Sequence, residues 1–254
     1  MNLDRILKDL QRVNLDKPHS VFSMYLNTDS TDPGHRGEWK LQLKNGLNSF
    51  ENYLEQSGNL VEYKHFQHVR EKVENYVEAN QLFFKKSVVL IASSDDTVWF
   101  AETFQMNVDS EFFWQENAVT DQLYQLKSRF PRTGIILLQH AKTRVIDAEV
   151  GEVNDTVELA VDGETEKWIP TNQMEDTSFR LANTQVKLNP NRTFKSLAPM
   201  VDRLAKDKGW EEIVIAGNKE EAELLEHYMN KSVNKIMNQN ILDKKPQKIV
   251  EEII

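Results

Sequence analysis

The sequence predicts a mixed α/β (α+β) protein of two domains. The chain has 254 residues, which accommodates two domains at about 100–200 residues each. Segments with helical spacing of apolar residues alternate with short β-branched runs. The pattern changes after the turn-forming segment 130–134. We therefore expect an N-terminal α/β domain with a helical hairpin over 1–129 and a C-terminal mixed-sheet domain over 130–254.

The first domain is expected to begin with a helix over 6–13 and a strand over 21–26. Trp39 to Leu54 then carry apolar side chains every three or four residues, which predicts a helix. Ser57-Gly58-Asn59 interrupts this pattern, and a second amphipathic stretch runs from Phe66 to Asn80. Two helices with so short a break between them indicate an antiparallel helical hairpin.

A β-hairpin is expected to follow the helices. Lys86–Ile91 is a continuous apolar run and Val98–Ala101 is a second strand candidate, with a turn at Asp95-Asp96 between them. In the second domain we expect a meander of three strands, then a long irregular loop over 163–190, and finally a helix, a strand and a helix. The strands of the second domain are predicted at 135–138, 144–150, 156–161 and 213–216, and its last helix at 218–229. The helix before it is expected to begin at the Asn189-Pro190 cap and to carry an apolar stripe from Phe194 to Leu204, with Pro199 either kinking it or lying in its first turn.

The composition excludes several classes of protein. Hydrophobic residues make up 39% of the chain, which is enough to fill a core, so global disorder is excluded. The chain has no cysteine, which excludes disulfides, thiolate zinc sites, iron–sulfur clusters and cysteine nucleophiles. The apolar runs are too short to span a bilayer, and the N-terminus does not have a signal-peptide pattern. We therefore expect a cytoplasmic protein without a membrane partner.

Histidines and paired carboxylates give no candidate metal or acid–base site. His65 and His68 lie three residues apart in a predicted helix, but no third ligand is near them in the sequence. Asp95-Asp96 and Glu251-Glu252 are interpreted as solvated turn or tail residues, because such side chains are rarely buried. The sequence therefore predicts neither a metal nor another cofactor.

Charge is divided sharply along the second domain. Residues 149–176 contain nine acidic residues and one lysine, whereas 177–210 contain seven basic residues and two acidic ones. The net charge of −9 argues against a nonspecific nucleic-acid binder when taken as an average. The division instead favours one basic edge that approaches an RNA backbone. The alternative is that both segments are ordinary solvated faces.

Three stretches resemble the archaeo-eukaryotic class-one peptide-chain release factors, most closely the bacterial Vms-like branch. They are Met24–Asp29, Glu38–Leu47 and Lys195–Pro199, the last running into Ala205–Trp210. The order of elements in the second half is also similar to the central domain of that family. The resemblance implies an RNase H-like mixed sheet in the second domain, with a long loop between the third strand and a basic helix.

The resemblance also implies hydrolysis of peptidyl-tRNA on the large ribosomal subunit. In that family a loop glutamine of a Gly-Gly-Gln motif helps to place a water molecule against the ester carbonyl. The present loop has no Gly-Gly-Gln, and Gln185 is the preferred counterpart, with Gln173 as the alternative. The residues expected to contact RNA lie in the basic stretch: Arg180, Lys187, Arg192 and Lys195.

The predicted hairpin tip, 57–60, lacks the Asn-Ile-Lys-Ser motif of family members that read stop codons. We therefore expect rescue or quality control of stalled ribosomes without codon reading. A catalytically inactive ribosome- or tRNA-binding protein of the same fold is the alternative, and Asn183 and Thr184, which stand where glycines would permit close approach, favour it. A third reading is an interaction protein that offers its acidic surface to a basic partner. No DNA partner is expected, and the sequence contains no signal for an oligomeric state.

Overall fold

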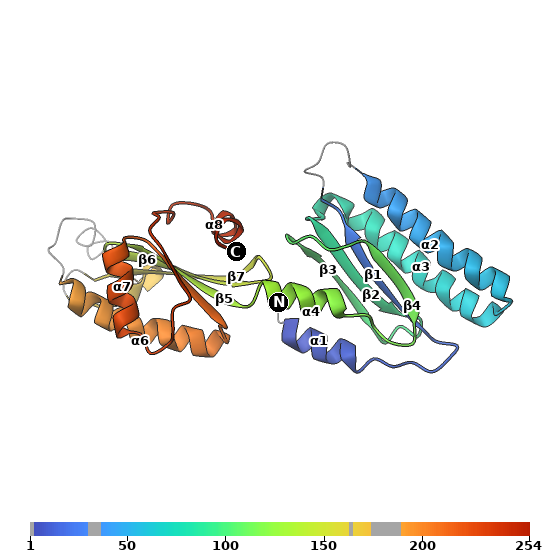
Figure 1. Cartoon of the computed structure of the whole chain (residues 1–254), viewed down its shortest axis with the longest axis horizontal. Coiled ribbons are helices and arrows are strands. Elements are labelled where there is room, and N and C mark those ends of the chain that lie inside the picture. Colours follow the sequence, from blue (N-terminus) through green and yellow to red (C-terminus); the bar gives the residue numbers. More distant parts are fainter. Residues whose placement is uncertain (1–2, 30–36, 163–164, 174–188) are drawn as a thin grey trace. The chain divides into compact units, whose positions relative to one another are not determined.

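The structure of the chain is a computed structural model that describes residues 3–29, 37–162, 165–173 and 189–254. The chain divides into two compact units, Met1–Ser128 and Arg129–Ile254. The first unit contains a four-stranded sheet and the second a six-stranded sheet, each accompanied by helices (Figure 1). The predicted fold class, a mixed α/β (α+β) chain with two sheets, is confirmed.

The sheet of the first unit is antiparallel, with strand order β3-β2-β1-β4. Its strands are β1 (Val21–Asn27), β2 (Ser87–Ser93), β3 (Trp99–Phe104) and β4 (Glu111–Gln115). The two central strands are almost wholly buried, which explains why their sequences read as continuous apolar runs. The two edge strands consist mostly of exposed and partly buried residues.

The predicted helical hairpin covers one face of this sheet (Figure 1). It consists of α2 (Glu38–Ser57) and α3 (Leu60–Asn80). Gly58 ends α2 in the left-handed conformation, with φ of 73°, which glycine adopts without steric cost. Asn59 then caps α3 by accepting a hydrogen bond from the Glu62 backbone N–H. The apolar faces of both helices pack on β1 and β2, and the buried residues of this core include Leu47, Phe66, Val69, Val73 and Phe22.

Three shorter helices are described in the first unit. They are α1 (Leu3–Gln11), the 3-10 helix η2 (Gln81–Phe83) that follows α3, and α4 (Asp121–Arg129). Leu3, Leu7 and Leu10 of α1 are buried, as the predicted amphipathic spacing requires. Lys127 of α4 forms an ion pair with Asp4 of α1, which links the two helices.

The sheet of the second unit has strand order β10-β9-β5-β6-β7-β8. β5, β9 and β10 are parallel neighbours, and the other pairs are antiparallel. The strands are β5 (Thr133–Gln139), β6 (Lys142–Glu149), β7 (Glu152–Val161), β8 (Trp168–Pro170), β9 (Glu212–Ala216) and β10 (Lys235–Met237). The meander predicted from the sequence is thus the β5–β6–β7 part of a larger mixed sheet.

Helices cover both faces of the second sheet. α6 (Pro190–Lys208) and α7 (Lys219–Tyr228) pack on one face, around Phe194, Leu197 and Val201. α8 (Pro246–Ile253) packs on the other face through Ile249, Val250 and Ile253. Pro199, expected to kink the helix or to lie in its first turn, lies inside α6 on the exposed side. The same face of α6 carries basic side chains, as described below.

Two expectations are wrong. Residues 163–190 are not irregular throughout, because β8 and the 3-10 helix η3 (Thr171–Gln173) lie within them. Trp168 is buried against the sheet, and this burial stabilises a strand too short to be recognised by periodicity. Glu251 and Glu252 are exposed, as expected for solvated residues, but they do not lie in a turn or a tail. They lie on α8, where they pair with Lys248 and Lys244.

Candidate functional site at the start of helix α6

Residues 166–173 and 189–194, which flank segment 174–188 on its two sides, are held together by a buried contact. The indole N–H of Trp168 donates a hydrogen bond of 2.9 Å to the backbone carbonyl of Thr193. The Trp168 ring also lies 6.5 Å, centroid to centroid, from the ring of Phe194. Both aromatic side chains are almost fully buried. We call these two flanking stretches the segment base.

The start of α6 is fixed by a conventional cap. The Asn189 side chain accepts a hydrogen bond from the Arg192 backbone N–H, and Pro190 occupies the first helical position. The Thr193 hydroxyl donates to the Asn189 carbonyl at 2.9 Å. The Tyr228 hydroxyl donates to Asn191 and so ties the first turn of α6 to α7. These contacts define the residue at which α6 begins.

A second contact at the segment base is electrostatic. Arg192 and Glu166 form an ion pair of 3.3 Å, in which the Arg192 side chain remains 69% exposed. Glu166 lies in the turn between β7 and β8 with φ of 53°, and its backbone N–H donates to the Asp162 carbonyl. The pair joins the residues on either side of segment 174–188 and partly neutralises the guanidinium group.

The exposed face of α6 carries a basic stripe, formed by Arg192, Lys195, Arg203 and Lys206. All four residues are exposed, and their spacing places them on one side of the helix, as expected for positions three, eight and eleven residues apart. Asp202, which could oppose them, instead accepts hydrogen bonds from Asn230 and the Lys231 backbone. Arg203 does pair with Asp207 at 3.5 Å, and Arg192 pairs with Glu166, so the stripe is partly neutralised at these two arginines.

Lys208, the last basic residue of α6, does not belong to the stripe. Its ammonium group bonds Asp155 of β7 at 2.7 Å. This hydrogen bond lowers the pKa of Asp155, against the opposite effect of partial burial. Lys208 thus fastens the end of α6 to the sheet.

The structure describes three of the six predicted site residues. Arg192 and Lys195 lie together in the first two turns of α6, and Gln173 is exposed at the end of η3. Gln185, Arg180 and Lys187 lie outside the described residues. Neither catalytic assignment is tested by the positions that are described, so Gln185 and Gln173 stay predictions.

A buried ion pair in the same unit is structural. Asp147 is 3% exposed and accepts two hydrogen bonds from the Arg132 guanidinium group and one of 2.8 Å from the Trp210 indole. The Trp210 ring lies so close over Gly134 that a Cβ at this glycine would approach it to 2.1 Å. These contacts attach the end of α6 to β5 and β6, and every polar atom of Asp147 is already used.

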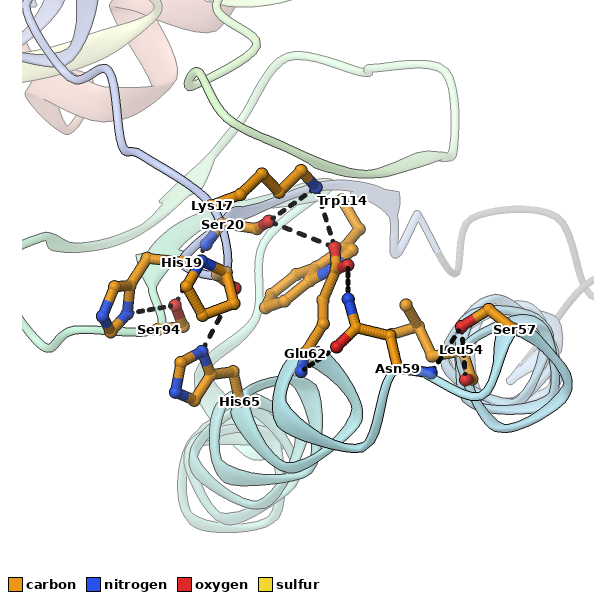
Figure 2. A network of polar contacts seen from close by, with 11 residues as sticks. Lys17, His19, Ser20, Leu54, Ser57, Asn59, Glu62, His65, Ser94 and Trp114 are labelled. Atoms are coloured by element: carbon orange, nitrogen blue, oxygen red, sulfur yellow. Dashed lines mark hydrogen bonds and ion pairs between the residues drawn. The ribbon is translucent and has the colours of Figure 1, made fainter.

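The tip of the α2–α3 hairpin contains a polar network that the sequence did not indicate (Figure 2). Glu62, only 9% exposed, accepts hydrogen bonds from Lys17 at 2.8 Å, from the Trp114 indole at 3.2 Å and from the Asn59 amide at 3.0 Å. Ser20 lies 3.5 Å from the same carboxylate. A capping-box pattern, Asn59 with Glu62 three residues later, is the one sequence signal that marks it.

The histidines of α3 do not form a metal site in the described residues. His65 lies 3.1 Å from the Pro18 carbonyl and stacks on His19. His68 instead pairs with Asp96, which also bonds Lys72. Within the ranges that the structure covers, no three metal-ligating side chains converge. In the same ranges, no helix is long and apolar enough to cross a membrane.

Comparison with known proteins matches residues 131–254 to a family described as bacterial archaeo-eukaryotic release factor family 5. A relative from Bacillus subtilis (strain 168), the uncharacterized protein YocB, is 33% identical over all of this chain and 99% of its own length. The chain belongs to the archaeo-eukaryotic release-factor superfamily. The matched residues contain the segment base and the whole of α6, and membership of a release-factor family implies a role related to translation and an interaction with the ribosome.

Two solved structures are also similar to the present chain. The archaeal translation termination factor aRF1 aligns with 98% of this chain and 72% of its own, at 12% identity and a TM-score of 0.32. A structure titled archaeal protein aligns over the same shares at 12% identity and a TM-score of 0.28.

Proposed function

We propose that this protein binds the large ribosomal subunit and hydrolyses the ester of peptidyl-tRNA on stalled ribosomes, without reading a stop codon. The observation that carries the proposal is the position of the basic stripe. It begins at the segment base, inside the region that matches a release-factor family. Lys195 and Arg192 at its start would contact RNA phosphates beside the predicted catalytic segment.

The chemistry that we propose needs no titrating protein base. A water molecule attacks the ester carbonyl, the bond to the tRNA ribose breaks, and the products are a free peptide carboxylate and a tRNA 3′-hydroxyl. A glutamine side chain, Gln185 by preference and Gln173 as the alternative, would orient the water and donate to the developing charge. Positioning and hydrogen bonding of this kind supply much of the acceleration in such reactions.

A second candidate function is binding without hydrolysis. Asn183 and Thr184 precede Gln185, where the family motif has two glycines. Residues with a Cβ resist the backbone conformations and the close approach that glycine permits. This sequence feature favours a protein that binds the ribosome or tRNA at the site where the hydrolase would act. Such a protein would protect or mark the stalled ribosome complex without hydrolysing the ester.

The deciding experiment is release of labelled peptide from stalled ribosome complexes. We expect release by the wild-type protein, a large loss with Gln185→Ala, and little change with Gln173→Ala. Gln125→Ala is the matched control, because Gln125 is an exposed glutamine of the first unit. Release that survives all three substitutions would remove the glutamine assignment.

Co-sedimentation with ribosomes distinguishes the hydrolase and the binding-only protein from the third possibility, an interaction protein that does not bind ribosomes. Binding that weakens with rising salt, together with absence of release, would favour the binding-only protein. A protein that stays in the supernatant at low salt would contradict both candidates and leave the interaction protein with an acidic surface.

A further inference from the structure

A groove of about 470 Å³ opens at the hairpin tip, in the first unit. Its lining is formed by three aromatic residues together with a serine, a lysine and a carboxylate: Phe50, Tyr53, Trp114, Ser49, Lys17 and Glu62. We call it the tip groove. This volume is within the range of sites that hold small organic ligands, and the residues lie far from the basic stripe in the sequence.

The tip groove offers hydrogen-bond donors and few acceptors. The Glu62 carboxylate lines it, but its oxygens already accept from Lys17, Trp114 and Asn59, and its side chain is 12% exposed. The Lys17 ammonium group, by contrast, has three donors and a side chain that is 51% exposed. Ser49 and Tyr53 add hydroxyl groups.

The charged groups around the tip groove are paired with one another, and the N-terminus of α3 lies beside them. Lys17 and Glu62 compensate each other in their ion pair. Glu62 lies in the first turn of α3, a helix of 21 residues, whose N-terminus contributes about half a positive charge. Glu51, a nearby acid on α2, bonds Arg70, which also pairs with Glu74. A single negative group in the groove would therefore bind through the donors of Lys17 and the hydroxyl groups, and not through a net positive potential.

The walls of the groove favour a flat or bulky apolar group. Phe50 and Trp114 are partly buried and pack against Phe66 from two sides, at centroid distances of 5.9 and 5.1 Å. Tyr53 is 69% exposed at the mouth of the groove. Leu60 and Val61 at the start of α3 are also exposed, at 71% and 53%. Exposed apolar side chains beside a groove are typical of binding sites.

We propose that the tip groove binds an organic carboxylate with an aromatic or large aliphatic body. The carboxylate would accept from Lys17 and the body would lie against Trp114, Phe50 and Tyr53. A phosphate monoester fits less well, because it carries nearly two charges and the groove has one lysine beside a carboxylate. This inference does not depend on the proposed role on the ribosome, since it concerns residues of the first unit alone.

Such a carboxylate could come from a free small acid or from the C-terminus of a peptide. Calorimetric titration of the full chain distinguishes these sources with N-acetyl-L-phenylalanine and a short peptide that ends in phenylalanine. We expect a Kd of about 1 mM or tighter for at least one of them. Tighter binding of the peptide identifies a chain terminus as the ligand, and equal or tighter binding of the free acid identifies a small molecule.

The amides of the two probes test the role of the carboxylate. N-acetyl-L-phenylalanine amide and the amidated peptide should bind at least tenfold more weakly than the corresponding acids. Amides that bind as tightly as the acids would overturn the proposal, and so would a lack of heat and of chemical-shift change with every probe at 10 mM concentration, about ten times the expected Kd.

Variants locate the binding in the groove. Lys17→Met should weaken binding at least tenfold, whereas Lys17→Arg should retain most of it, and Lys64→Met is the control at an exposed lysine of α3 outside the groove. Tyr53→Ala is the second variant, because Tyr53 is exposed and its loss leaves the core intact. It should weaken binding several-fold. Unchanged affinity in both Lys17→Met and Tyr53→Ala would place the ligand elsewhere and contradict the inference.

Discussion

At the residue scale, Trp168 connects the sequence on one side of segment 174–188 to the sequence on the other. It fills the core between β8 and α6 and satisfies the Thr193 carbonyl through its indole N–H. A large aromatic residue in a three-residue strand gives no periodic signal, so the sequence alone predicts only a loop in this region. The polar contact that holds it is between residues 25 positions apart.

Replacing Trp168 by Phe should destabilise the second unit by about 1–2 kcal/mol, because it removes a buried hydrogen bond and leaves a space where the larger indole ring packs. The Thr193 carbonyl keeps the hydrogen bond from the Ser196 hydroxyl. Urea unfolding followed by circular dichroism measures this change. Trp99→Phe is the control, since Trp99 is 42% exposed. Equal small effects of both substitutions would mean that the buried hydrogen bond contributes little.

The pair between Lys208 and Asp155 leads to a prediction on pH. The Lys208 ammonium holds the pKa of Asp155 below the usual aspartate range. Because this pKa is lower in the folded state, the pair stabilises the protein above the unfolded aspartate pKa and loses its effect as pH falls through the folded one. Carbon NMR titration of the Asp155 carboxyl should show the low pKa, and Lys208→Met should raise it. A titration curve that Lys208→Met leaves unmoved would show that the pair does not form in solution.

Ion pairs between residues distant in the sequence cannot be predicted from the sequence alone. Lys17 and Glu62 are 45 positions apart, and Lys208 and Asp155 are 53 apart. Nothing in either local sequence indicates its partner. Arg192 and Lys195 were predicted as basic residues of one helix from spacing and charge, but the Glu166 partner of Arg192 depends on the β7–β8 turn.

At the scale of elements, the strongly patterned segments were predicted, and the short segments without a continuous apolar or periodic pattern were not. The helical hairpin and the central strands β1, β2 and β5 have continuous apolar patterns that reflect their burial. β4 lies at an edge, where its three central residues are only partly buried, and β10 has three residues. Such elements are fixed by pairing with a neighbouring strand rather than by local preference.

Helix α6 is the element on which ribosome binding should depend. Lys195→Ala combined with Lys206→Ala should weaken co-sedimentation with ribosomes and reduce the slope of log affinity against log salt by roughly 1.5, if each lysine contacts one phosphate. Lys219→Ala combined with Lys248→Ala is the matched control, because these exposed lysines belong to other helices. An equal change of slope in the control pair would mean that overall charge, and not α6, determines binding.

Removal of the Glu166–Arg192 ion pair, in contrast to removal of the lysines, should strengthen ribosome binding. Glu166→Gln removes the carboxylate that partly neutralises Arg192 and should strengthen ribosome binding by about two- to fivefold, the size expected for an exposed pair. Glu158→Gln is the control, since Glu158 pairs with Arg144 away from α6. Weaker binding by Glu166→Gln would indicate that the pair positions Arg192 rather than masking it.

At the scale of the whole molecule, the net charge does not reflect the separation of charge between the acidic segment 149–176 and the basic segment 177–210. The net charge of −9 describes neither α6 nor the acidic residues on β7. Part of the opposed charge is used internally, since Asp155 fastens Lys208 and Glu158 bonds Arg144. The exposed stripe on α6 that remains is suited to one RNA-facing surface on an otherwise acidic chain.

The two units should fold independently, because each has its own sheet and its own buried core. The core of the first unit lies between β1, β2 and the α2–α3 hairpin, and that of the second between its sheet and α6, α7 and α8. Fragments 1–128 and 129–254 expressed separately should each show a cooperative urea transition, with a slope of about 1–3 kcal/mol per molar. A fragment that gives a broad, featureless transition would show that its core needs the rest of the chain. Tryptophan fluorescence can follow both transitions, because Trp39, Trp99 and Trp114 report on the first unit and Trp168 and Trp210 on the second.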